Sequence, residues 1–252
     1  MIYDAHVHVG YYSRLGSRAP FYYSPRRVVG VLRRCGVEDF IVSSTCAQVT
    51  CIPLADVLRE AREMKRVAGG RAHQFFWLAG RFYDDDRNLK VLDTGLYEGL
   101  KLHELETPWM GARRRDLERV LAIAEERHLP VQFHCGSEPC SPRALAKIAA
   151  KFPSINFDFA HCFPMDEMAA VMSDLPNVWT DVAWLADDAW ALLGDYDWHG
   201  RLLFGSDFPA YHAKKGGGFT ELYRKMLNEF REWVDESDTA FKSFLKSNQE
   251  RN

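Results

Sequence analysis

The sequence has no hydrophobic run long enough to cross a membrane, because no segment approaches the roughly 20 apolar residues that a spanning helix needs. The first candidate strand begins at Ile2, which leaves no room for a charged leader and an apolar signal segment. The sequence also has no excess of basic residues. It contains 32 Lys and Arg and 35 Asp and Glu, whereas proteins that bind polyanions usually carry surplus positive charge. We therefore expect a cytoplasmic protein that acts on a small molecule, with neither nucleic acid nor membrane as partner. Homo-oligomer formation stays open.

The cysteine patterns of common metal and redox sites are missing too. Cys46 with Cys51, and Cys135 with Cys140, are spaced C-x4-C, which matches neither a zinc knuckle nor a redox C-x-x-C motif. A cytosolic domain of this length has enough core without disulfides. We expect reduced thiols that pack as small buried hydrophobic side chains at all six positions: Cys35, Cys46, Cys51, Cys135, Cys140 and Cys162.

What the sequence does contain is an alternation of short, β-rich apolar runs with longer segments of helical period. This alternation is typical of a parallel sheet built from βα units, and 252 residues match one (β/α)8 barrel of roughly 250 residues. We predict an α/β fold, a single (β/α)8 TIM barrel forming one domain over residues 1–252. The candidate strands are 2–9, 39–44, 74–79, 97–103, 130–134, 156–161, 178–184 and 202–207. The candidate helices are 25–35, 53–68, 114–127, 142–151, 165–173 and 187–193.

A doubly wound sheet is the alternative architecture. Such a sheet usually carries a Gly-rich phosphate-binding turn after its first strand. Here the first strand is followed by Gly10-Tyr11-Tyr12, which is not such a turn. The pattern therefore favours the barrel, with residues 214–218 as its most flexible stretch.

The first predicted strand carries a histidine pair. It runs Asp4-Ala5-His6-Val7-His8, and because side chains alternate faces along a strand, His6 and His8 point the same way, about 6.6 Å apart along the backbone. Two imidazoles so placed can share one metal ion. An H-x-H motif alone is weak, since an incidental pair of histidines has the same spacing.

Three further residues that can bind a metal fall at the ends of later strands. His134 ends strand 130–134, His161 ends strand 156–161 and Asp207 ends strand 202–207. In a closed barrel the strand ends converge at one mouth, where the chemistry of such barrels sits. Imidazole nitrogens with a carboxylate oxygen suit a divalent transition metal, and zinc is the leading candidate.

The order H-x-H, then His, His and Asp on later strands resembles the amidohydrolase superfamily of metal-dependent barrels. Four segments are similar to its amidohydrolase-related branch, which includes decarboxylases and lactonases, and the resemblance covers almost the whole chain, including residues 241–248 as a closing helix. These segments are Asp4-Ala5-His6-Val7-His8, Gly99-Leu100-Lys101-Leu102-His103, Phe133-His134-Cys135-Gly136 and Leu203-Phe204-Gly205-Ser206-Asp207-Phe208-Pro209.

The resemblance implies that His6, His8, His134 and Asp207 ligate the metal. His161 would then polarise the scissile group or bind a second ion, against the alternative of a core histidine hydrogen-bonded to backbone. Asp207 has an alternative of its own, since an aspartate before Phe-Pro can cap a helix. We expect one ion, with a second left open.

Substrate binding is expected from Lys101, His103 and Arg81. Lys101 and His103 share a strand face, so both are expected to face the mouth. Lys101 could anchor a substrate carboxylate, pair with a neighbouring acid or carry a metal-bridging carbamate, in that order of preference. Arg81 could clamp a substrate carboxylate or form a surface ion pair with the nearby aspartates.

These residues together predict a metal-dependent hydrolase of the amidohydrolase type. Metal-activated water would cleave an amide, lactone or ester bond of a small carboxylated substrate, with Asp207 moving the proton and His161 stabilising the oxyanion. A non-oxidative decarboxylase of an aromatic or enol acid is the nearest alternative. A barrel that binds metal without catalysis is the other.

Overall fold

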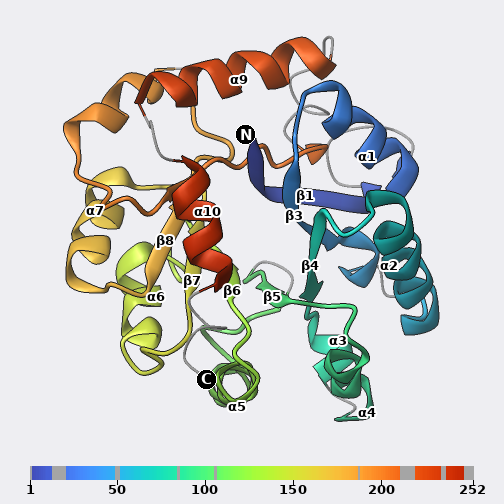
Figure 1. The fold of residues 1–252 in the computed structure, drawn as a ribbon. Coiled ribbons are helices and arrows are strands. Elements are labelled where there is room, and N and C mark those ends of the chain that lie inside the picture. Colours follow the sequence, from blue (N-terminus) through green and yellow to red (C-terminus); the bar gives the residue numbers. More distant parts are fainter. Residues whose placement is uncertain are drawn as a thin grey trace.

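A computed structural model of the chain describes residues 2–12, 21–48, 52–83, 86–104, 107–186, 188–210, 219–233 and 237–246. It is an α/β fold around one curled, mostly parallel sheet of nine strands in the order β2-β1-β3-β4-β5-β6-β7-β8-β9 (Figure 1). Only β2 runs antiparallel to its neighbour β1. The strands are β1 (Tyr3–Tyr12), β2 (Phe21–Tyr23), β3 (Asp39–Ser44), β4 (Ala72–Trp77), β5 (Gly99–Leu102), β6 (Val131–His134), β7 (Phe157–Ala160), β8 (Val178–Asp181) and β9 (Leu202–Leu203).

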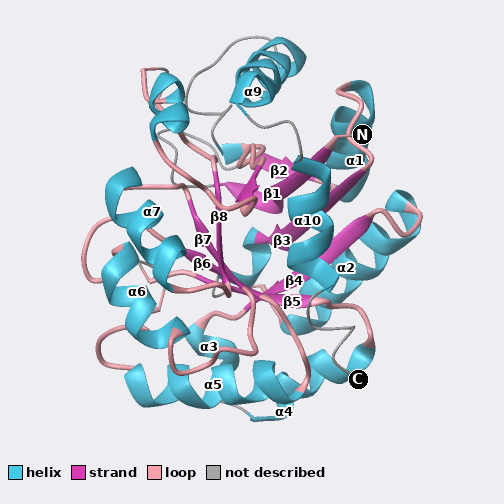
Figure 2. Cartoon of the chain, turned by 60° about the vertical axis from the view of Figure 1, so that its left-hand side comes forward, coloured by secondary structure: helices cyan, strands magenta, loops and turns pink. Residues whose placement is uncertain are grey.

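Helices cover the outer face of this sheet (Figure 2). The longer ones that follow β strands are α1 (Pro25–Arg34), α2 (Leu54–Ala68), α5 (Arg114–Glu126), α6 (Pro142–Ala149) and α7 (Met165–Asp174). Shorter turns are η1 (Thr45–Gln48), α3 (Gly80–Tyr83), α4 (Asp86–Leu89), η2 (Lys90–Thr94) and η3 (Trp190–Asp195), and the chain continues through α9 (Phe219–Trp233) and α10 (Ser237–Lys246). Within the described ranges, no helix combines the length and apolar character that a bilayer span requires.

The predicted alternation is confirmed, and local signals explain where two helices begin. Ser24 caps α1 by accepting from the Arg27 N–H, and Ser141 caps α6 by accepting from the Ala144 N–H. In both helices a proline follows the cap, where its missing N–H costs no helical hydrogen bond. All eight predicted strands are present, each shifted by a few residues at most.

Other expectations need correction or lie outside the described residues. The helix predicted over 187–193 is the 3-10 helix η3 instead. Neither β2 nor α9 was expected. The five described cysteines are free and buried, in line with the expected thiols. The predicted flexible stretch 214–218, Cys51 and the last part of the expected closing helix lie outside the described residues.

Hydrogen bonds join β1 to the residues that follow β9. The regular part of β9 stops at Leu203, but the Ala5 N–H donates to the Phe204 carbonyl and the His8 N–H to the Phe208 carbonyl, both at 2.7 Å. Val7 and Phe208 form a parallel bridge. Residues of β1 therefore run beside residues 204–208.

Helix α10 lies across the strands at the end of the sheet where they begin (Figure 1). Phe241 and Phe244 on this helix pack into one apolar cluster with Tyr3, Phe75 and Trp179 of the strands. The Asn156 side-chain amide donates to the Phe244 carbonyl at 2.9 Å, which fixes the helix against the start of β7. The histidines and Asp207 lie toward the opposite end of the strands, which α10 does not cover.

We predict that Phe244→Ala destabilises the protein by about 3 to 5 kcal/mol, because truncating a buried phenylalanine removes apolar burial and leaves a cavity. Phe244 is fully buried. Urea unfolding measures the change. The matched control is Phe163→Ala, whose side chain is 59% exposed and should cost about 0.5 kcal/mol or less. Equal losses in both variants would contradict the assigned packing of α10.

Candidate metal centre

His6 and His8 point from β1 to the same interior position. Their Nε2 atoms lie 3.1 Å apart, as the alternation of the strand requires. Asp207 Oδ1 lies 3.0 Å from His8 Nε2 and 3.8 Å from His6 Nε2. This oxygen is buried and has no hydrogen-bond partner. Three atoms of the kinds that bind a divalent ion therefore converge, and one of them lacks a partner of its own.

Asp181, at the end of β8, completes a second overlapping group with His6 and His161. Its Oδ2 accepts from His6 Nδ1 at 2.8 Å, and its Oδ1 accepts from the N–H groups of His161 and Ala183 at 3.1 and 2.9 Å. Sequence reasoning missed this residue because it extended the strand to Trp184. The available signal was an acid in a β-rich run, one strand before Asp207.

The hydrogen bonds assign tautomers to three of the histidines. His161 Nδ1 donates to the Ala183 carbonyl at 3.1 Å, so the Nε2 of a neutral His161 accepts from His134 Nδ1 at 2.9 Å. His6 donates through Nδ1 to Asp181 in the same way. The Nε2 lone pairs of His6 and His134 are thereby left free of a backbone or carboxylate partner, which is the arrangement found in metal-binding histidines.

The structure places His134 beside His161 rather than within the two groups formed around His6. Both ring nitrogens of His161 are occupied. His134 as a ligand, and His161 as a group facing the substrate, consequently stay predictions.

Burial keeps these imidazoles neutral near pH 7. It lowers the pKa of His6 and His161 well below the usual range, and it lowers the pKa of His134 to about 4, with the Lys101 charge as the second cause for His6 and His134. Burial also raises the pKa of Asp207, although the adjacent His8 ring, whose Nε2 lies 3.0 Å from Oδ1, opposes this effect. Neutral imidazoles are the protonation state that metal binding requires.

Lys101 faces the interior, as predicted. It is 1% exposed, and its Nζ lies 3.1 Å from His6 Nε2. Burial lowers its pKa to about 8, while the negative charges of Asp181, Asp158 and Asp207 work in the opposite direction. An ion at His6 Nε2 would compete with this ammonium for the same lone pair.

His103 also lies beside the cluster. Its ring stacks on His134 with centroids 4.0 Å apart and on Trp77 with centroids 5.6 Å apart. Its Nδ1 is buried without a hydrogen-bond partner. A polar atom in that state costs free energy unless a ligand satisfies it.

Arg81 donates to three backbone carbonyls that follow β3. Its guanidinium donates to the carbonyls of Ala47, Ile52 and Cys46 at 2.9, 2.7 and 3.2 Å. The sequence shows the charge but does not show which carbonyls it contacts. Binding of a substrate carboxylate by Arg81 stays a prediction.

Backbone strain gathers at the same strand ends. His161, Trp184 and Asp207 have positive φ values of 82°, 62° and 46°. This left-handed region is unfavourable for residues with a side chain, and such residues collect at functional sites. The Trp184 indole N–H donates to Asp207 Oδ2 and leaves Oδ1 to face the histidines.

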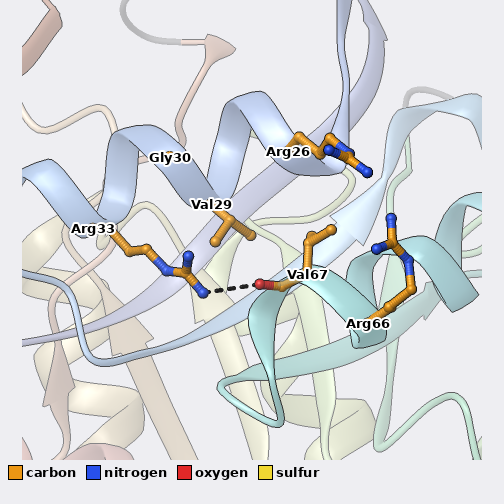
Figure 3. Close-up of a pocket in the computed structure, with 6 residues that line it drawn as sticks. All are labelled: Arg26, Val29, Gly30, Arg33, Arg66 and Val67. Carbon is orange, nitrogen blue, oxygen red and sulfur yellow. Dashed lines mark hydrogen bonds between the residues drawn. The ribbon is translucent and has the colours of Figure 1, made fainter.

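A surface pocket of about 300 Å³ lies elsewhere, between α1 and α2 (Figure 3). Its arginines already have protein partners: Arg33 donates to the Val67 carbonyl at 2.9 Å, and Arg26 and Arg66 both lie near Glu63. Arg26 and Arg33 are exposed on the solvent-facing side of α1, where a charged side chain is the usual occupant. The pocket lies outside the histidine cluster.

We predict that Gly205→Ala disturbs the site through Asp181. A Cβ at this position would lie 2.9 Å from Asp181 Cγ, closer than real contacts allow, so the carboxylate must move away from His6. Metal content after loading should fall, as measured by elemental analysis of dialysed protein. The matched control is Gly136→Ala, where a Cβ meets nothing within 4 Å. Full metal content in Gly205→Ala would count against Asp181 as the orienting group.

The sequence model of the family described as Amidohydrolase matches residues 46–237, which is more than half of the chain. No curated protein matches. A structure of a probable 2-pyrone-4,6-dicarboxylic acid hydrolase from Acinetobacter baumannii with citric acid bound has a TM-score of 0.64 and 14% identity, covering 98% of this chain and 97% of that chain.

Two further structures have the same fold. An amidohydrolase from Burkholderia multivorans with bound zinc has a TM-score of 0.66 and 12% identity, covering 95% of each chain. A putative 2-pyrone-4,6-dicarboxylic acid hydrolase from Pseudomonas putida has a TM-score of 0.62 and 16% identity, covering 97% of each chain. At these identities the structures show the fold alone. Together with the family match, they establish that the chain belongs to the amidohydrolase family, a family of metal-dependent hydrolases.

Proposed function

We propose that the protein hydrolyses an amide, lactone or ester bond of a small carboxylated substrate, with one divalent ion, preferably zinc, in the site. The observation that carries this proposal is the convergence of His6 Nε2, His8 Nε2 and Asp207 Oδ1, the last buried without a hydrogen-bond partner. Two nitrogens and a carboxylate oxygen so placed fit zinc.

The proposed ligands are His6, His8, His134 and Asp207. Support for His134 comes from its tautomer, which leaves Nε2 without a protein hydrogen bond. A bound divalent ion lowers the pKa of a coordinated water to about 7 and thereby supplies hydroxide at neutral pH. A three-residue group at His6, His161 and Asp181 is the alternative position for an ion, or the place of a second one.

Asp207 is the proposed proton carrier. Oδ1 is the proposed metal-binding oxygen, so Oδ2 would accept the proton from the attacking water and later donate it to the leaving group, once it releases the Trp184 indole N–H. Burial raises the pKa of this carboxyl, which makes it a better base. His161 supports the His134 ring in this proposal, and it can face the scissile carbonyl only if their hydrogen bond opens.

The proposed substrate carries a carboxylate, which Lys101 and His103 would bind. Support comes from the buried ammonium of Lys101 and from the unpartnered Nδ1 of His103. Two of the similar structures are hydrolases of a pyrone dicarboxylic acid by their names, and one has citric acid bound. A carboxylated lactone is accordingly the first substrate class to test.

The proposal includes a complete eight-stranded barrel formed as one domain. The hydrogen bonds from Ala5 and His8 to residues 204 and 208, and the Val7 to Phe208 bridge, support closure between β1 and β9. The eight parallel strands in chain order give further support.

The experiment is a screen of zinc-loaded protein against lactones, amides, esters and aromatic acids, each carboxylate paired with its methyl ester. Hydrolysis that disappears after metal removal and returns with zinc supports the proposal. Release of carbon dioxide without consumption of water identifies the decarboxylase alternative instead. Failure to turn over any compound in the presence of bound metal would favour a binding protein.

We predict that Asp207→Asn lowers turnover by about 10²- to 10⁴-fold, the usual contribution of a general base, because the amide cannot accept the proton. It should retain more metal than a His6→Ala, His8→Ala double variant, since one oxygen remains. Turnover, metal content and melting temperature are measured together. The control is Asp93→Asn, an exposed carboxylate paired with Arg127. Undiminished turnover in a folded, metal-containing Asp207→Asn variant would exclude Asp207 as proton carrier.

We predict that Lys101→Met weakens substrate binding but leaves metal content unchanged or higher, because it removes the ammonium that contacts His6 Nε2. KM should rise for the carboxylated substrate and change little for its ester. Lys65→Met, at an exposed lysine that binds the Gly95 carbonyl, is the control. Loss of the bound metal from Lys101→Met, with metal retained in Lys65→Met, would instead indicate a carbamate on Lys101.

A further inference from the structure

We propose that Gln132 is a positioning residue that sets the orientation of His6 through Asp181. The inference rests on the proposed function only in taking His6 as a metal ligand. Gln132 lies on β6, is 1% exposed and precedes His134 by two residues, so both side chains point into the interior.

One side-chain amide connects four strands at this point. Gln132 Nε2 donates to Asp158 Oδ2 on β7 at 2.7 Å and to the Ala5 carbonyl on β1 at 3.0 Å. It also lies 3.4 Å from Asp181 Oδ2 on β8. The amide nitrogen has two hydrogens, so the two shorter contacts use one each and the contact to Asp181 shares one of them. The amide is thereby held in one position.

Two of these contacts act on His6 from different sides. Ala5 is the residue before His6, so the amide holds the backbone that carries the ring. Asp181 Oδ2 accepts both from Gln132 and from His6 Nδ1, so the amide also holds the carboxylate that orients the ring. With Nδ1 donating to Asp181, the lone pair of His6 Nε2 faces His8 and Asp207.

The neutral amide suits its position between two buried carboxylates. Asp158 and Asp181 are both fully buried, and Asp158 Oδ1 already lacks a hydrogen-bond partner. Gln132 donates toward both acids without adding a charge. A residue with no donor would remove this hydrogen bond from Asp158 Oδ2, and a buried polar group without its partner costs free energy. The same change would remove the contact between Gln132 Nε2 and Asp181 Oδ2.

The test compares Gln132→Leu with Gln74→Leu in the full-length protein. Gln74 is a matched control because it is 5% exposed, lies on β4 and donates to the Leu96 carbonyl, away from the histidines. Gln132→Met, which is unbranched and of similar length, serves if Gln132→Leu does not fold.

The first measurement is the ring-nitrogen NMR spectrum of metal-free protein, with His6 assigned by comparison with His6→Gln. Wild type and Gln74→Leu should show a single His6 tautomer protonated at Nδ1. Both Gln132 variants should lose that single tautomer. This readout requires neither metal nor substrate.

The second measurement is the zinc dissociation constant, determined by competition with a chelator. Removing such a supporting hydrogen bond should weaken zinc binding by about 10- to 100-fold, whereas Gln74→Leu should leave it unchanged. An unaltered His6 tautomer with unaltered zinc affinity in folded Gln132 variants would overturn the proposal. Suppose that wild type turns over none of the compounds while the Gln132 variants still lose the single His6 tautomer. That result would count against the proposed function, and the positioning role of Gln132 would be unaffected.

Discussion

The site depends on the contact between residues 4–8 of β1 and residues 204–208 after β9. At its centre, buried Asp4 accepts four hydrogen bonds, from the N–H groups of His6 and Ser206 and from the hydroxyls of Ser206 and Tyr223. Burial raises the pKa of Asp4 to about 7, while these donors oppose that rise. Without this contact, His6 and His8 would have no defined position relative to Asp207.

Around that contact, His6, His8 and His161 are each held by an atom outside the histidine cluster. Asp181 holds His6, the Ser43 hydroxyl lies 2.8 Å from His8 Nδ1, and the Ala183 carbonyl holds His161. The partners come from β3, from β8 and from the turn after β8, so the geometry of the site depends on how these two strands lie relative to β1. Burial then sets the charge state, since it favours neutral imidazoles and a more basic Asp207.

The sequence predicted the elements well where the signal was local. Short apolar, β-rich runs located the eight parallel strands, and the helical period located α1, α2, α5, α6 and α7. The three-residue strand β2 and the 3-10 helix η3 carry too few residues for a periodic signal, so tertiary contacts determine them. The helix α9 was missed although its residue Tyr223 binds Asp4.

The candidate site was also predicted only in part, because the sequence gives local signals and does not give tertiary contacts. Strand-terminal placement brought His6, His8 and Asp207 together, because parallel strands end at one side of a sheet. Asp181 was missed since the end of its strand was misplaced by three residues. The position of Arg81 depends on carbonyls in a loop, and no residue pattern encodes where those carbonyls point.

The pairing of β1 with residues 204–208 also has a consequence for biosynthesis. His6 and His8 precede Asp207 by most of the sheet, so the histidine pair leaves the ribosome long before the carboxylate does. An ion met in that interval finds the two imidazoles without Asp207. The convergence of His6, His8 and Asp207 is therefore a product of the completed pairing between β1 and residues 204–208, and it forms late in the order of synthesis.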